Sequence, residues 1–223
     1  MNIIIRLIIK LIKYFVVDNI MEYIENKYLS LCDKPSDINE HLPTLFEYAS
    51  KCESIIECGV KNCVSSWALV YGLLNNNKQD KIIILNDIVY CDVTELLNIT
   101  KNIDIDIKFI QCSNIDLELN NNIDLTFIDT YHVYGQLKRE LTKYGKITNK
   151  YIIMHDTTID EIYSESIRNK HDISLKMNET GYSYDEITIG LWKAIEEFLN
   201  DNLNWKIKER YINNNGLTIL ERI

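Results

Sequence analysis

The chain has 223 residues and a formal net charge of −9, with 46% hydrophobic and 26% charged residues. A chain of this length buries roughly 70–75% of its unfolded surface and can fold without disulfides or metals. The composition excludes collagen-like, low-complexity and disordered classes. Because an acidic surface repels phosphate backbones and the body of the chain has no basic patch, we expect no nucleic-acid partner.

The six cysteines do not form a metal-binding pattern. None belongs to a C-x-x-C pair and no histidine cluster lies near them, so we expect no zinc site. Several lie inside apolar runs, where cysteine behaves as a small hydrophobic residue. Free thiols are typical of a reducing compartment, and we expect a cytoplasmic protein.

The first predicted element is an apolar helix over residues 3–17. Arg6, Lys10 and Lys13 recur at helical spacing and fall on one stripe, while most other residues are Ile or Leu. The segment is too short and too charged to span a bilayer, and it lacks the cleavage site of a signal peptide. Two interpretations are open: the helix packs on its own domain or a second subunit, or it lies peripherally on a membrane surface with its cations facing anionic lipid.

Residues 1–50 as a whole are predicted to form an N-terminal helical extension. The helix continues over residues 18–33 and is broken at Asp33-Lys34-Pro35-Ser36. A second helix carries Leu42 to Ala49, and Pro43 within it predicts a kink or a late start. Residues 51–223 are predicted to form one domain.

From Ser54 onward, short apolar runs alternate with helical patterns. This alternation indicates a parallel sheet with helices on both faces. The segment Asn213-Asn214-Asn215-Gly216 is a hairpin signal between two final strands. We therefore predict an α/β, Rossmann-like, doubly wound sheet of seven mostly parallel strands with a terminal antiparallel hairpin. The expected strands cover residues 54–60, 81–85, 107–110, 123–128, 151–154, 205–211 and 217–221; the expected helices include 67–74, 95–97, 136–144, one beginning at Thr157, and 191–199.

Ligands of open parallel sheets bind beyond the carboxyl ends of the strands, so the residues that follow each strand are the candidate site. Only one glycine, Gly59, remains of those that a dinucleotide pyrophosphate needs, which argues against a nucleotide-dependent dehydrogenase. A cofactor without phosphates, such as S-adenosylmethionine, needs less: one glycine beside the adenosyl group and an acid for the ribose. The candidate residues at or just beyond the ends of the predicted strands are Glu57, Gly59, Asp87, Ser113, Asp129, His132, His155 and Asp156.

Several motifs in this order carry a family resemblance. Glu57-x-Gly59, followed by Val64-Ser65-Ser66, resembles motif I of class I S-adenosylmethionine-dependent methyltransferases, and Asp87 stands where their ribose-binding acid stands. Residues 127–134 and 154–157 resemble segments of the small-molecule O-methyltransferases grouped with macrocin- and cephalosporin-tailoring enzymes. Residues 190–198 resemble the helix that precedes their hairpin. The resemblance covers roughly residues 50–222.

The resemblance implies methyl transfer from S-adenosylmethionine to a hydroxyl of a small acceptor, such as a sugar or a glycosylated metabolite. His132 is the candidate base, acting beside Asp129. Asp129 and Asp156 could hold Mg²⁺, and residues 181–190 could form a lid. The implied cofactor-binding residues are Glu57, Gly59, Ser65, Asp87 and Ser113.

The chain departs from the family pattern at three positions. Cys63 replaces a usual glycine, Tyr131 replaces a second acid, and His155 replaces the first acid of an Asp-Asp pair. The three-acid metal site is therefore not carried over intact. These departures keep open a second interpretation, a catalytically inactive scaffold or partner subunit with the same fold.

Each candidate residue also has a purely structural interpretation. Glu57 and Asp156 could cap helices, Asp87 and Ser113 could be turn residues, and His132 could be a buried structural histidine. Sequence alone leaves these alternatives open.

Overall fold

One seven-stranded sheet forms the centre of the chain, in a computed structural model that describes residues 3–223, with side chains described from Val17 onward. The strands are β1 (Ser54–Cys58), β2 (Ile82–Asp87), β3 (Asp106–Gln111), β4 (Ile123–Ile128), β5 (Thr148–His155), β6 (Trp205–Tyr211) and β7 (Leu217–Arg222). Their order is β3-β2-β1-β4-β5-β7-β6. Strands β1 to β5 pair in parallel, and β7 is antiparallel to both neighbours. The predicted fold class is confirmed.

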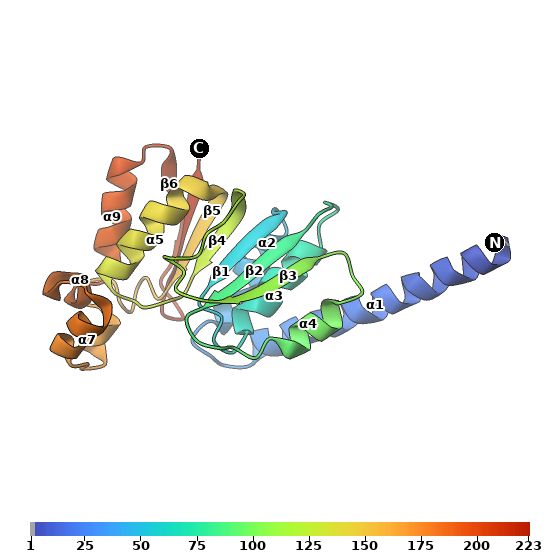
Figure 1. Ribbon diagram of the computed structural model, residues 1–223, viewed down its shortest axis with the longest axis horizontal. Coiled ribbons are helices and arrows are strands. Elements are labelled where there is room, and N and C mark those ends of the chain that lie inside the picture. Colours follow the sequence, from blue (N-terminus) through green and yellow to red (C-terminus); the bar gives the residue numbers. More distant parts are fainter. Residues whose placement is uncertain (1–2) are drawn as a thin grey trace.

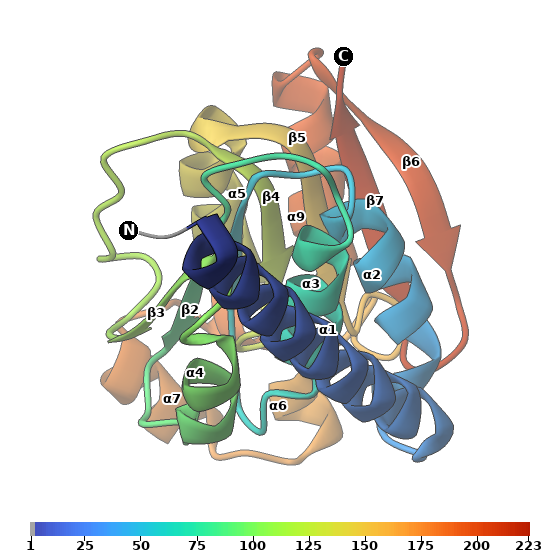
Figure 2. The ribbon, with the colours of Figure 1, turned by 90° about the vertical axis from the view of Figure 1, so that its right-hand side faces the viewer.

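Helices cover both faces of this sheet (Figures 1 and 2). They are α1 (Ile3–Asp33), a 3₁₀ turn at Asn39–His41, α2 (Leu42–Ala49), α3 (Val64–Leu74), α4 (Thr94–Thr100), α5 (Tyr134–Ile147), α6 (Glu165–Arg168), α7 (Ile173–Thr180), α8 (Tyr184–Thr188) and α9 (Trp192–Asp201). Neighbouring residues of a strand point to opposite faces. Ile55 therefore packs with the cluster under α1, α2 and α3, and Ile56 with the cluster under α5 and α9. Burial on both faces explains why the strands read as continuous apolar runs.

The second half of α1 fixes that helix to the domain. Ile24 is fully buried, and the Tyr28 ring lies 5.5 Å from the ring of Phe46 and 5.2 Å from that of Tyr71. The first half extends beyond the sheet (Figure 1). Pro43 stands in the first turn of α2, which confirms the late start. In residues 3–223, no helix is both long enough and apolar enough to span a bilayer.

The segment after β5 differs from the prediction. The prediction of a helix beginning at Thr157 is wrong. The next helix, α6, begins at Glu165 and has only four residues. The N–H groups of Thr158 and Ile159 instead donate to the Asn215 carbonyl at 3.0 and 2.9 Å, so the hairpin loop holds this segment in a turn. Residues 181–190, the segment that could form a lid, contain α8, whose capping box joins Ser183 and Glu186.

The hairpin predicted at residues 213–216 is confirmed between β6 and β7. Asn214, Asn215 and Gly216 have φ values of +44°, +69° and +98°. Asparagine and glycine tolerate this left-handed region better than other residues, which explains the composition of the turn.

The chain leaves β1 through Gly59, where three strand ends meet. The Gly59 N–H donates to the Asn86 carbonyl at 2.8 Å, and the Asp129 N–H donates to the Cys58 carbonyl at 2.8 Å. Gly59 has φ +95°, and a Cβ at this position would lie 1.9 Å from the Asp129 carbonyl oxygen. Only glycine therefore lets the ends of β1 and β4 approach so closely.

We expect Gly59→Ala to destabilise the protein by roughly 4 kcal/mol or more, among the largest single-residue effects, because the Cβ meets backbone rather than a mobile side chain. Gly181→Ala is the matched control: Gly181 also has positive φ but has nothing within 4 Å of its Cβ position. It should cost only the left-handed strain, about 1–2 kcal/mol. Urea unfolding of both variants measures the difference. Equal losses of stability would show that the Asp129 carbonyl does not exclude a Cβ at position 59.

Candidate functional site

Two cavities meet beyond the carboxyl ends of β1, β2 and β4. The first, of about 610 Å³, lies between the ends of β2 and β4 and is closed on one side by α7. The second, of about 450 Å³, lies between the end of α1, the start of α3 and the start of α4. Gly59, Lys61 and Asp129 line both. The two cavities therefore form one site around the loop that follows β1, at the point where the strand order reverses.

Asp87 lines the first cavity and also builds the loop beside it. Its Oδ2 accepts from the N–H groups of Val60 and Lys61 at 2.9 and 3.0 Å, and its Oδ1 accepts from Val89 at 3.0 Å. Burial opposes ionisation, but these backbone donors outweigh it and lower the pKa of Asp87. Asp87 is thus both a turn residue and a cavity residue, and its contact with a ribose stays a prediction.

Glu57 is fully buried and joins β1 to α3. Its two carboxylate oxygens accept from the hydroxyls of Ser65 and Ser66, the latter at 2.6 Å. Burial raises the pKa of Glu57 to about 8, against the lowering effect of the two hydroxyls. Glu57 therefore orients the first turn of α3, and Ser65 lines the second cavity. Direct cofactor contacts of both residues stay predictions.

Ser113 lines the first cavity next to Asn114, and its carbonyl accepts from the N–H groups of Asp116 and Leu117. The residue therefore begins a turn and also faces the cavity. Its predicted role in cofactor binding is compatible with this position and stays a prediction.

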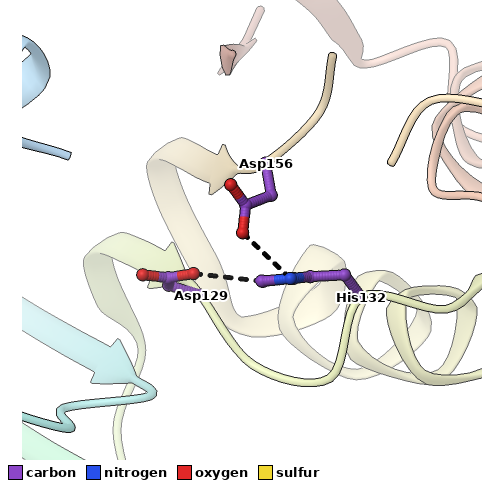
Figure 3. Close-up of side chains that lie close together, drawn as sticks. All are labelled: Asp129, His132 and Asp156. Atoms are coloured by element: carbon purple, nitrogen blue, oxygen red, sulfur yellow. Dashed lines mark hydrogen bonds and ion pairs between the residues drawn. The ribbon is translucent and has the colours of Figure 1, made fainter. Parts of the chain in front are cut away.

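His132 contacts both Asp129 and Asp156 (Figure 3). Its Nε2 is 3.1 Å from Asp129 Oδ1, and its Nδ1 is 2.9 Å from Asp156 Oδ2. Two further carboxylates, those of Asp160 and Glu165, lie 3.5 and 3.3 Å from Nδ1. Burial alone would lower the pKa of His132, but Asp129, Asp156 and Glu165 raise it well above the ordinary value. Both ring nitrogens face carboxylates, so the imidazolium form is favoured.

His155 extends this cluster from β5. Its Nε2 lies 3.2 Å from the Asn214 carbonyl and so carries a proton, while its Nδ1 faces Asp129 Oδ1 at 3.5 Å and Asp156 Oδ1 at 3.4 Å. Burial lowers the pKa of His155, but Asp129 and Asp156 outweigh this and raise it. Asp156 itself has φ +57°, an uncommon backbone conformation for a residue other than glycine.

Sequence reasoning missed His41, which contacts the same hairpin loop. Its Nε2 donates to the Asn213 carbonyl at 3.0 Å and lies 3.2 Å from the Asn214 carbonyl, and its ring is 5.8 Å from that of His155. No local pattern links His41 to a hairpin so distant in sequence.

Sequence reasoning also missed Glu140 on α5. This buried carboxylate accepts from Asn114, Thr130 and Gln136 and so fixes one wall of the first cavity. The available signal in the sequence was an acid on the apolar side of the helix predicted over residues 136–144.

The fit of the expected Mg²⁺ can be tested on this geometry. Asp129, His132 and Asp156 bring one ligand atom each within 4.8 Å of one another. One of the three donors is an imidazole, whereas Mg²⁺ requires near-octahedral oxygen coordination. The two ring nitrogens of His132 already contact the two carboxylates that were expected to share the ion, and the favoured imidazolium supplies the positive charge there (Figure 3). The arrangement does not fit Mg²⁺ bound jointly by Asp129 and Asp156.

Comparison with known proteins supports the fold, and the function has to be argued from the residues of the site. No protein-family model matches the chain, and no curated protein matches it. The O-methyltransferase TomG of Streptomyces achromogenes, solved with S-adenosylmethionine, aligns with a TM-score of 0.54 over 85% of this chain and 81% of its own, at 10% identity. The N-methyltransferase NodS of Bradyrhizobium japonicum aligns with a TM-score of 0.53 over 85% and 98%, at 12% identity.

The methyltransferase PaMTH1 of Podospora anserina, solved with S-adenosylhomocysteine, aligns with a TM-score of 0.51 over 93% of this chain and 88% of its own, at 13% identity. At such identities the likeness establishes a shared fold. The chain therefore has the Rossmann-like fold of these methyltransferases, and the finer resemblance to the macrocin-tailoring group stays a prediction.

We expect the stability of the protein to fall as pH rises from about 4.5 to about 8, because folded Glu57 holds its proton more tightly than the unfolded chain. Glu57→Gln should remove this part of the pH dependence, on the order of 1.4 kcal/mol for each pKa unit. Urea unfolding across this pH range measures it. Glu118→Gln, at an exposed position, is the matched control. If the free energy of unfolding changed with pH in the same way for the wild type and Glu57→Gln, Glu57 would be ionised in the folded protein.

We expect neither EDTA nor millimolar MgCl₂ to change the melting temperature, because His132 already supplies the positive charge between Asp129 and Asp156. Differential scanning calorimetry with both additions is the measurement. A rise with MgCl₂ that disappears in Asp156→Asn would show that the carboxylates bind the ion and that the ring moves aside.

Proposed function

We propose that the protein is an S-adenosylmethionine-dependent methyltransferase that methylates a hydroxyl group of a small molecule. The observation that carries the proposal is the site around Gly59. A single glycine, in close contact with the end of β4, separates two cavities at the reversal of strand order. Their volumes lie in the range of small-molecule sites. One glycine suits a cofactor without a pyrophosphate.

The first cavity suits the adenosyl part of the cofactor. Asp87 offers carboxylate oxygens to ribose hydroxyls, and Ile88 and Val89 provide apolar surface beside it for the adenine. Ser113 and Asn114 bring polar groups to the other end of the same cavity. These contacts match an uncharged nucleoside better than a phosphate, because no cluster of glycine N–H groups faces the cavity.

The second cavity suits the methionyl part. The N-cap of α3, Cys63, makes no side-chain capping hydrogen bond, so the first N–H groups of this helix are available to an anion. Lys34 and Lys61 line the same cavity and add positive charge for a carboxylate. Asp37 and Asp92, also in its lining, offer acceptors for an ammonium group. The donor methyl would then lie near Gly59, which both cavities share.

Asp129 connects the cofactor cavities with the buried charges. Its side chain remains 26% exposed and lines both cavities, while Oδ1 contacts His132. S-adenosylmethionine supplies a methyl group already activated on a sulfonium sulfur. The chain therefore mainly has to align the acceptor hydroxyl and receive its proton. Asp129 is placed to orient the hydroxyl.

His132 can receive the proton only after losing one of its own, because carboxylates face both ring nitrogens. Because its neighbours raise the pKa of His132, this residue can act as a base only at pH values above the ordinary histidine pKa. No step in this mechanism requires a metal bound by Asp129 and Asp156.

Polar groups from α5 and α7 support a small polar acceptor. Tyr182 donates to Gln136 Oε1 at 2.6 Å, and the guanidinium of Arg139 stacks 4.1 Å from the Tyr182 ring centre. Lys176 and Thr180 line the same side of the first cavity. The segment expected to act as a lid is thus tied to α5 beside the cavity. The described cysteines are all free thiols, in agreement with the cytoplasmic location that we propose.

One observation favours the alternative of an inactive scaffold. Both Asp87 oxygens already accept backbone hydrogen bonds, so cofactor binding must share them. A carboxylate has about four acceptor sites, and three are used here. The remaining capacity makes the enzyme the better-supported function, and cofactor binding distinguishes the two.

Isothermal titration calorimetry with S-adenosylhomocysteine tests the proposal. We expect micromolar binding by the wild type, and Asp87→Ala should weaken it by roughly 10- to 150-fold, the loss of a charged hydrogen-bonding partner. Asp185→Ala, an exposed change on α8, should bind as the wild type does.

Absence of binding heat for the wild type would support the scaffold. Unchanged affinity in a folded Asp87→Ala variant would remove Asp87 from the cofactor site.

A further inference from the structure

The first half of α1 is chemically unlike the rest of the chain. Residues 3–17 contain three cations, no acid, and otherwise only aliphatic and aromatic side chains. The whole chain has a formal charge of −9, so the remainder carries −12 without these three cations. A negatively charged surface would therefore attract this segment and repel the body of the protein.

The second half of α1 holds the helix axis in place. Ile20, Ile24 and Tyr28 are buried against the domain, and Lys27 pairs with Glu95 of α4 at 2.8 Å. The helix is continuous from Ile3 to Asp33, so the position of its first half follows from that of its second. Figure 1 shows this first half extending outward from the domain.

Spacing distinguishes between the two surfaces that could cover residues 3–17. At 100° per residue, Arg6, Lys10 and Lys13 fall on one narrow stripe, and apolar residues occupy the rest of the circumference. A second copy of the helix would cover only one seam of this apolar surface. A lipid interface covers much more of it and also pairs the cationic stripe with anionic headgroups.

We propose that residues 3–17 lie in the plane of an anionic membrane interface and hold the acidic domain at its surface. The 15 residues measure about 22 Å as a helix, too short to cross a hydrocarbon core of about 30 Å. Long cationic side chains reach the headgroups while the helix body contacts acyl chains. This proposal is independent of methyltransferase activity.

Cosedimentation of the full chain with vesicles tests it, using phosphatidylcholine alone and phosphatidylcholine mixed with phosphatidylserine. We expect strong retention only on the mixed vesicles. The triple variant Arg6→Gln, Lys10→Gln, Lys13→Gln should lower the partition coefficient onto the mixed vesicles by roughly 50-fold or more, because it loses the attraction of all three cations to anionic lipid. The control variant Lys146→Gln, Lys206→Gln, Lys208→Gln loses the same charge elsewhere and should bind as the wild type does.

A second variant tests the apolar side. Ile4, Ile8 and Phe15 fall opposite the cationic stripe, and their joint replacement by serine should abolish retention while leaving the melting temperature of the domain unchanged. Light scattering after gel filtration gives the oligomeric state of every variant. Equal retention on both vesicle types, or none on either, would overturn the proposal. A wild-type dimer that the serine variant converts to monomer, without vesicle binding, would assign the segment to a subunit interface.

Discussion

The absence of a side chain at Gly59 is the constraint on which the site depends. Because the Asp129 carbonyl occupies the place of a Cβ, the ends of β1 and β4 are held together by backbone contact. Asp87 completes the arrangement from β2 by accepting the N–H groups that follow Gly59. Backbone contacts and the Asp87 carboxylate thus join three strand ends. The space beyond them remains open as two connected cavities rather than being filled by core side chains.

Three of the acids beside these cavities, Asp129, Asp156 and Asp160, contact cationic side chains of the chain itself. Asp129 and Asp156 face His132 and His155, and Asp160 receives two hydrogen bonds of 2.8 Å from the Arg168 guanidinium. Uncompensated buried charges would cost far more than the fold could tolerate. Contacts with these histidines therefore favour the ionised forms of Asp129 and Asp156. The pKa of Asp129 is consequently far below its ordinary value, because the two histidines outweigh the effect of burial.

The parts of this structure that follow local rules could be predicted from sequence. Apolar runs located the strands of the sheet, and the residues at 213–216 located the hairpin, because both signals act over a few neighbouring positions. Strand alternation also predicted that Gly59, Asp87 and Asp129 would lie at one edge, and all three line the first cavity.

Tertiary contacts decided what sequence reasoning missed. A helix was predicted to begin at Thr157, but the Asn215 carbonyl accepts the N–H groups of Thr158 and Ile159. The position of His132 between two acids could not be foreseen, because it depends on where the turn after β5 places Asp156. Sequence left Asp87 open between a ribose-binding acid and a turn residue, because its bonds to Val60 and Lys61 depend on how the two loops meet.

The hairpin loop also has a consequence for the order in which the molecule assembles. The carbonyls of residues 213 and 214 receive His41 from a position 172 residues earlier, and that of Asn214 also contacts His155. Contacts at such separation carry a large loop-closure entropy and form after local ones. A chain emerging from the ribosome could already collapse its parallel strands while His155 still lacked its carbonyl partner. We therefore expect the hairpin contact of His155 to form late, when the final hairpin places β7 between β5 and β6.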